Sequence, residues 1–195
     1  MESGMSETSR KGAGFERSVS KEVDDHLPGG WEIETPTDKR YDMIARSPKG
    51  HIFPIELKGG SGLLDVSTVV DFGSEVENDV EKGSLRKSSS IPEPTIETQD
   101  IIVKPVIATN REIAPASSDY ASTFHIAVVS SPEIELTETI VRDIEHERIS
   151  RLGQELVSRL TELDDLIQTD KLHSQSAREE KAPARKEDWY RMSSK

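Results

Sequence analysis

Hydrophobic residues recur every three or four positions in three parts of the chain, which is the spacing of one face of a helix. The first stripe starts after Gly14 and must end at the helix-breaking Pro28-Gly29-Gly30. A second stripe covers roughly residues 64–82, although Gly73 and several valines are poor helix formers. The third extends from residue 140 to about 169, behind the start signal Ser131-Pro132. The pattern therefore predicts three helices.

Runs of β-branched and aromatic residues between these stripes indicate strands. We predict strands at residues 31–35, 41–46, 51–58, 101–108 and 124–129. Pro105 has no amide hydrogen and must lie at the start, the edge or a bulge of its strand. The order α-β-β-β-α-β predicts an α/β fold, with a central mixed β-sheet of about five strands flanked by helices and a long C-terminal helix.

The composition of the remaining segments predicts the domain organisation. Residues 1–11 read as a disordered N-terminal tail, residues 12–131 as one domain with a loop insertion at 83–99, residues 132–169 as a helical extension, and residues 170–195 as a basic flexible tail. Arg148 and Arg159 interrupt the apolar seam of the extension and Gly153 breaks it. We therefore expect the extension to pack on the domain or on a second copy rather than to form a free coiled coil.

Composition restricts the class of protein. With 195 residues and 33% hydrophobic content, the chain can bury one moderate core. The absence of Cys excludes a disulfide scaffold, thiolate catalysis and Cys-ligated zinc. No segment approaches about 20 consecutive apolar residues, and the N-terminus carries no apolar signal segment. We therefore expect a cytoplasmic protein with no membrane partner.

The order of the charged residues at two predicted strands suggests a catalytic site. Thirteen residues separate Asp42 from Glu56, and Lys58 follows two positions later. With 23 Glu and 12 Lys in the chain, chance predicts about one or two Glu-x-Lys tripeptides, and Glu179-x-Lys181 is a second copy. The first copy differs because it ends an apolar, β-forming run, in which residues two apart share one face.

If the two segments are neighbouring strands, Asp42, Glu56 and Lys58 meet at one point. Two carboxylates and an ammonium group can hold Mg²⁺ against a phosphodiester and activate water. Glu16 lies beside the stripe of the first helix and is a candidate fourth member. The histidines have no partners at ligand-like spacing, so a zinc site is not supported.

The formal net charge of -12 opposes DNA binding, because Lys and Arg supply much of the affinity for phosphates. The acidity is concentrated outside the motif. Residues 1–60 hold 9 Lys and Arg against 11 Asp and Glu, whereas residues 61–170 hold 9 against 22. The basic residues that could line a phosphate track, or else be ordinary surface charges, are Arg10, Lys11, Arg17, Lys21, Lys39, Arg40, Arg46 and Lys49.

These motifs resemble those of the PD-(D/E)XK nuclease superfamily. Lys11-Gly-Ala-Gly-Phe-Glu-Arg17, Tyr41-Asp-Met-Ile-Ala45 and Ile55-Glu-Leu-Lys58 are similar to the archaeal Holliday junction resolvases. Residues 106–110 and 121–129 look more like the Mrr-type restriction endonucleases. The likeness covers about residues 11–130 and implies a restriction-endonuclease-like core. Tyr41 replaces the name-giving proline, and residues 83–99 and the helical extension match neither subgroup well.

The resemblance implies a catalytic set of Glu16, Asp42, Glu56 and Lys58 and a Mg²⁺ cofactor, for which Mn²⁺ would substitute. Asp42, Glu56 and the backbone carbonyl of Leu57 would hold the metal, and Glu16 would reach it through a water. Lys58 would orient the attacking water or stabilise charge in the transition state. The residues that would contact DNA are Lys11, Arg17, Thr37, Lys39 and Arg40.

The expected function is that of a metal-dependent DNA endonuclease, a hydrolase acting on branched (Holliday junction) DNA or on foreign or modified DNA. The alternative is a catalytically silent nuclease-fold module that binds DNA or a protein through its C-terminal helix. A weaker alternative is a metal-dependent phosphodiesterase acting on RNA or nucleotides. Resolvases act as symmetric dimers, so a homodimer through a sheet edge or the C-terminal helix remains open.

Overall fold

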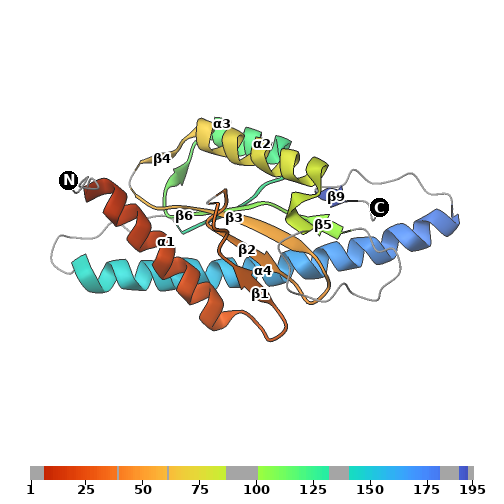
Figure 1. The fold of residues 1–195 in the computed structure, drawn as a ribbon, viewed down its shortest axis with the longest axis horizontal. Coiled ribbons are helices and arrows are strands. Elements are labelled where there is room, and N and C mark those ends of the chain that lie inside the picture. The colour runs from red at the N-terminus through yellow and green to blue at the C-terminus, as the bar shows by residue number, and fades with distance from the viewer. Residues whose placement is uncertain are drawn as a thin grey trace.

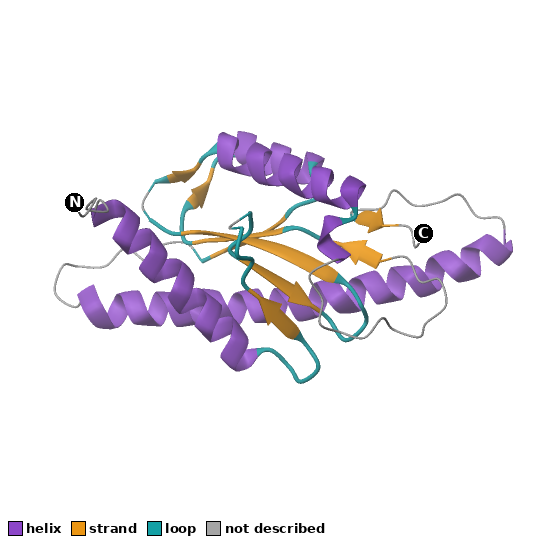
Figure 2. Ribbon diagram, viewed as in Figure 1, coloured by secondary structure: helices purple, strands orange, loops and turns teal. Residues whose placement is uncertain are grey.

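The computed structural model describes residues 7–38, 40–60, 62–86, 101–131, 141–180 and 189–192. They form an α/β fold in which helices flank a mixed central sheet (Figures 1 and 2). The helices are α1 (Glu7–His26), α2 (Val66–Lys82), α3 (Pro115–Thr123) and α4 (Val141–Glu180), with a 3-10 turn η1 (Ser84–Arg86) after α2. The strands are β1 (Glu32–Glu34), β2 (Met43–Arg46), β3 (Ile52–Lys58), β4 (Leu63–Leu64), β5 (Ile101–Val103), β6 (Val106–Thr109), β7 (Glu112–Ile113), β8 (Ala127–Ser130) and β9 (Tyr190–Met192).

The central sheet has an antiparallel part and a parallel part that meet at β3. Strands β1, β2 and β3 form an antiparallel meander, whereas β3 pairs in parallel with both β5 and β6. Pro105 divides the predicted strand 101–108 into these two pieces, because it has no N–H for the ladder. The β6 piece continues in parallel to β8, and the β5 piece pairs antiparallel with β9. Within the described residues the sheet therefore has seven strands rather than about five.

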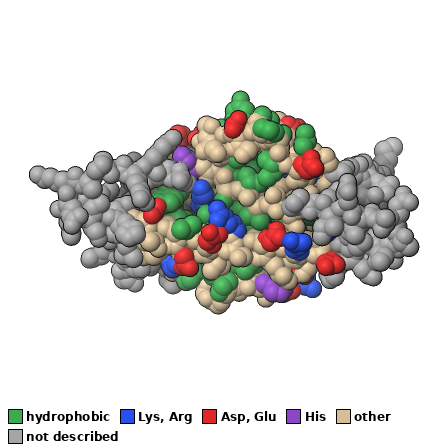
Figure 3. Space-filling model, turned by 180° about the vertical axis from the view of Figure 1, so that it is seen from behind, with side chains coloured by type: hydrophobic (Ala, Val, Ile, Leu, Met, Phe, Trp, Pro, Cys, Tyr) green, Lys and Arg blue, Asp and Glu red, His purple; other side chains and the backbone are tan. Residues whose placement is uncertain are grey.

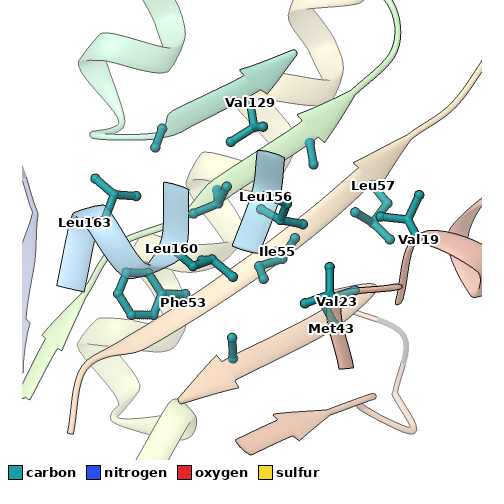
Figure 4. Close-up of a cluster of buried hydrophobic side chains, with 14 of the residues drawn as sticks. Val19, Val23, Met43, Phe53, Ile55, Leu57, Val129, Leu156, Leu160 and Leu163 are labelled. Carbon is teal, nitrogen blue, oxygen red and sulfur yellow. The ribbon is translucent and has the colours of Figure 1, made fainter. Parts of the chain in front are cut away.

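Side chains along β2 and β3 point alternately to the two sides of the sheet, and both sides are apolar. Met43, Ile55 and Leu57 belong to a buried cluster that also takes in side chains of α1 and α4 (Figure 4). Ile44 and Ile52 belong to a second cluster that includes side chains of α2 and α3. Figure 1 shows the resulting layers, with α1 and α4 on one side of the sheet and α2 and α3 on the other.

The C-terminal helix α4 is part of the same core. Its apolar stripe packs into the cluster that α1 and β3 share, through Leu152, Leu156, Leu160, Leu163 and Ile167. The predicted packing on the domain is therefore confirmed for this stretch. None of the helices in the described part of the chain, α4 included, is long and apolar enough to span a membrane.

Polar contacts fasten α4 to the turn between β2 and β3. His51 is fully buried, and its Nδ1 lies 2.7 Å from Asp164 Oδ1. Lys49 Nζ lies 3.2 Å from Asp164 Oδ2 and 2.5 Å from Asp165 Oδ1. Burial alone would raise the pKa of Asp164, but hydrogen bonds from His51, Ser47 and Lys49 outweigh it and hold the pKa below its usual value. These contacts stabilise the packed position of α4.

Two predicted tails require correction. Residues 7–11 were predicted to be disordered, but α1 already begins at Glu7, and Glu, Arg and Lys in this stretch are good helix formers. The predicted basic flexible tail contains the end of α4 and then β9. Trp189 packs against the α1–α4 cluster and Tyr190 against the α2–α3 cluster, so this apolar pair holds the segment on the sheet.

Other predictions fall partly outside the described residues. The helix start at Ser131-Pro132 and most of the loop insertion at 83–99 cannot be compared, because 87–100 and 132–140 lie outside them. The second helix was predicted at 64–82 and runs from Val66, since the short strand β4 precedes it and pairs with β7. A pairing between two-residue strands leaves no periodic pattern in the sequence, so neither strand was predicted.

Candidate active site

The antiparallel pairing of β2 and β3 brings the two predicted carboxylates to the same level of the sheet. Met43 pairs with Ile55, so the next position in this register sets Asp42 opposite Glu56. The Asp42 N–H donates to the Ile55 carbonyl at 3.1 Å. In return the Leu57 N–H donates to Asp42 Oδ2 at 2.7 Å. Asp42 is therefore fixed by the backbone of β3 beside Glu56.

Glu56 and Lys58 point to the same side of β3, away from Leu57. Their side chains form an ion pair and retain 17% and 29% exposure, respectively. They are thus shielded from bulk water but still reachable by a ligand. Across the parallel pairing, Glu56 lies level with Ile107 and Lys58 with Thr109. The end of β3 thus carries the charged residues of the motif next to the end of β6.

Close packing between Gly59 and Phe15 brings α1 to this end of β3. A Cβ atom on Gly59 would lie 2.6 Å from the Phe15 ring, so the helix can approach this closely only because residue 59 has no side chain. Glu16 follows Phe15 in α1, and its negative charge contributes to the pKa values of both Glu56 and Lys58. The structure therefore brings together Glu16, Asp42, Glu56 and Lys58.

Burial and mutual charge perturb the ionisation of this group. Burial raises the pKa of Asp42, although the Leu57 N–H and the Lys58 charge oppose the shift. Burial and the charge of Asp42 raise the pKa of Glu56, with a smaller contribution from Glu16 and opposition from Lys58. Burial would lower the pKa of Lys58, but its hydrogen bond to Glu56 and the surrounding negative charges outweigh that effect and raise it. Perturbed groups of this kind are typical of functional sites.

The turn after β6 supports the end of β3 and was not predicted as part of the site. Thr109 Oγ1 donates to the Lys58 carbonyl at 2.7 Å, and the Gly60 N–H donates to Asn110 Oδ1 at 3.1 Å. Arg111 donates to the Gly59 carbonyl through Nε at 3.0 Å and Nη2 at 2.6 Å. A signal was present in the sequence, because polar residues directly after a strand parallel to β3 must lie at the same sheet edge.

Thr37 and Arg40, two of the predicted DNA-contacting residues, lie at a cavity whose lining does not include Glu56 or Lys58. Arg40 Nε lies 2.6 Å from Asp38, and Arg40 Nη1 donates to both carboxylate oxygens of Asp79 on α2. Tyr41 donates to the same Asp79 at 2.8 Å. That cavity has a volume of about 110 Å³, and Asp79 also lines it. Arg17 is exposed on α1, whereas Lys39 and the Lys11 side chain lie outside the described residues.

Two further members of the proposed phosphate track are also paired with acids. Arg46 is buried, lies 3.6 Å from Glu34 and donates to the Leu85 carbonyl at 2.9 Å. Lys49 is held by Asp164 and Asp165 on α4. Figure 3 shows acidic and basic side chains interspersed over the face opposite to that of Figure 1. Much of the positive charge near the motif is thus used within the fold.

The carboxylates of Asp42 and Glu56 are suitable ligands for a hard divalent cation. Carboxylate oxygens are the ligands that Mg²⁺ prefers, and a cation between these two residues would relieve the repulsion from Asp42 that adds to burial in raising the pKa of Glu56. No cluster of three or more His, Asp or Glu in the described part of the chain is arranged to hold a metal ion. A cation at this point would therefore depend on Asp42 and Glu56 for its side-chain ligands.

Comparisons with protein-family models, with curated proteins and with solved structures found no match to this chain. Its function is therefore inferred from the residues of the site and their geometry.

Proposed function

We propose that the protein is a metal-dependent DNA endonuclease that hydrolyses phosphodiester bonds. The observation that carries this proposal is the convergence of Glu16, Asp42, Glu56 and Lys58 at the end of β3, in the order along the chain that the PD-(D/E)XK resemblance requires. Two adjacent, partly buried carboxylates with one ammonium group are a costly arrangement for folding alone. Binding of a cation and a phosphate gives this arrangement a function.

The two carboxylates would hold the cation, with the Leu57 carbonyl as a further ligand. A bound Mg²⁺ would supply Lewis acidity and lower the pKa of a coordinated water. Asp42 is held in place for this task by the Leu57 N–H, so its second carboxylate oxygen can face a ligand. Glu56 reaches the same point from the opposite strand.

Lys58 acts as a cation rather than as a base. Its raised pKa keeps the ammonium protonated at neutral pH, so it can donate to phosphoryl oxygens as negative charge develops on them. Its ion pair with Glu56 orients it in the absence of substrate. Glu16 adds a third carboxylate from α1 and is suited to hold a water at the edge of the site.

A cleavage panel tests the function and identifies the substrate. Purified protein is incubated with linear duplex, methylated duplex, flap and four-way junction DNA in Mg²⁺ and, separately, in a chelator. We expect nicking or cleavage of at least one DNA in Mg²⁺, retained in Mn²⁺ and absent with the chelator. Preference for the junction would support the branched substrate, and preference for methylated duplex the modified one.

An RNA duplex and a cyclic dinucleotide serve as comparison substrates in the same panel. Cleavage of these alone would replace DNA by RNA or nucleotides as the substrate class. Inertness toward every substrate in both metals would contradict the endonuclease. The non-cutting module would then be the better account.

A further inference from the structure

Arg111, in the turn after β6, is a cation fixed beside the proposed catalytic residues. Its backbone N–H donates to Thr109 Oγ1 at 3.0 Å, and that hydroxyl donates to the carbonyl of Lys58. Its Nε and Nη2 both donate to the Gly59 carbonyl. The guanidinium lies against Gly60, where a Cβ atom would be 3.1 Å from Nη2. Arg111 is therefore attached to the two residues that follow Lys58.

Arg111 differs in its partners from four other cations close to the sheet. Arg40, Arg46, Lys49 and Lys58 are each paired with a carboxylate. Within the described residues Arg111 forms no such ion pair, and the partner of its guanidinium is the neutral carbonyl of Gly59. A guanidinium has five N–H donors, so several remain for another acceptor. The side chain is partly exposed, which leaves it open to a ligand.

We propose that Arg111 contacts a backbone phosphate of the DNA next to the bond that is cut, an inference that rests on the proposed endonuclease function. The site itself carries three carboxylates and one ammonium group, so a polyanion needs further positive charge close by. A guanidinium matches phosphate oxygens in geometry, and anchoring on Gly59 reduces the side-chain entropy lost on binding. Arg111 supplies this charge at the end of β3.

The test is DNA binding without cleavage. Affinities for a labelled linear duplex and a labelled four-way junction are measured by fluorescence anisotropy in EDTA, between low and moderate salt. For Arg111→Gln we expect several-fold weaker binding, and a plot of log K against log salt whose slope is smaller by about 1, the value for one lost phosphate contact. Arg111→Lys keeps the charge and is expected to retain the wild-type slope.

The two variants separate phosphate contact from support of the turn. Gln and Lys both keep a donor for the Gly59 carbonyl, so a purely supporting role predicts that Arg111→Gln and Arg111→Lys both bind DNA as wild type does. Arg151→Gln, at an exposed site on α4 paired with Glu155, is the matched control. A wild-type slope in Arg111→Gln, with wild-type DNA binding intact, overturns this inference alone. Failure of the wild-type protein to bind either DNA overturns the proposed function together with it.

Discussion

At the scale of single residues, the proposed active site is electrostatically unfavourable in the isolated protein. Asp42 and Glu56 are largely buried, lie opposite each other and both have raised pKa values. The positive charge of Lys58 lowers the pKa of both carboxylates and so opposes this shift. Substitutions that neutralise such a site commonly stabilise a protein while removing its function. This trade-off gives a test of the site that does not depend on knowing the substrate.

Asp42→Asn is expected to stabilise the protein at neutral pH. A carboxyl whose folded-state pKa is raised stabilises the fold only below its unfolded pKa, near 3.8 here, and that contribution is lost as pH rises through the folded pKa. At pH 7 the ionised Asp42 therefore destabilises the fold. The amide oxygen of Asn can still accept the Leu57 N–H, so we expect the free energy of unfolding to rise by about 1 kcal/mol.

Urea denaturation at several pH values measures this effect. The gain from Asp42→Asn should shrink as pH falls through the raised folded-state pKa and disappear below the unfolded pKa of about 3.8, because the wild-type carboxyl is then protonated in both states. Asp119→Asn, at an exposed position of α3, is the control and should change stability little at any pH. A loss of stability for Asp42→Asn at pH 7 would mean that the site is a structural ion network.

At the scale of elements, the site depends on the junction of α1, β3 and the turn after β6. The Phe15 ring of α1 packs against Gly59, and the Gly59 carbonyl accepts a hydrogen bond from Arg111. Gly60 has a φ of +121°, which residues with side chains rarely adopt, and its N–H is held by Asn110. These adjacent glycines therefore set the distance between Glu16 and the β3 residues.

Gly59→Ala should impair both folding and cleavage. The new methyl group would lie within 2.6 Å of the Phe15 ring, so α1 must shift outward and carry Glu16 with it. We expect a loss of about 1–3 kcal/mol of stability, as for other overpacked sites, and a fall in cleavage rate at temperatures where the variant is still folded. Gly29→Ala is the control, since nothing lies within 4 Å of its added methyl. An unchanged cleavage rate in folded Gly59→Ala would show that the position of Glu16 does not matter.

Much at the element scale could be predicted from periodicity. The stripe from Phe15 to Leu27 predicted the C-terminal part of α1, and the alternation around Ile55 and Leu57 predicted β3, because those side chains have one buried face. Gly73 and Gly153 were interpreted as helix interruptions, but both lie inside helices, where Phe124 and Glu22 respectively pack against them. Close packing between elements distant in sequence leaves no local signal.

The same limit applies to the candidate site. The order of Asp42, Glu56 and Lys58 was readable because two neighbouring strands contain it. The pairing of Arg40 with Asp79, 39 residues away, could not be predicted from the sequence. The same holds for the hydrogen bonds that Arg111 donates to Gly59, 52 residues away. Arg40, which was predicted to contact DNA, is accordingly paired with Asp79 in the fold.

At the scale of the whole molecule, α4 completes one helical layer on the sheet and β9 adds a strand to the sheet. The apolar stripe of α4 is used in the protein's own core between Leu152 and Ile167. A partner protein could reach that stripe only by displacing α1 and the sheet from it. This disfavours the alternative in which the protein binds a partner through the apolar face of α4. A homodimer, if formed, is better served by a sheet edge such as β1 or β8.

The most direct measurement of the central claim is the nicking of supercoiled plasmid DNA in Mg²⁺ by the wild-type protein and by site variants. We predict that wild type converts the plasmid to open-circular or linear forms, and that Glu56→Ala and Lys58→Ala lose about 100-fold or more of the rate. Glu162→Ala on α4 and Lys82→Ala on α2, both at exposed positions, should cleave as wild type does. Equal rates in wild type, Glu56→Ala and Lys58→Ala would contradict the assignment of this site as a nuclease centre.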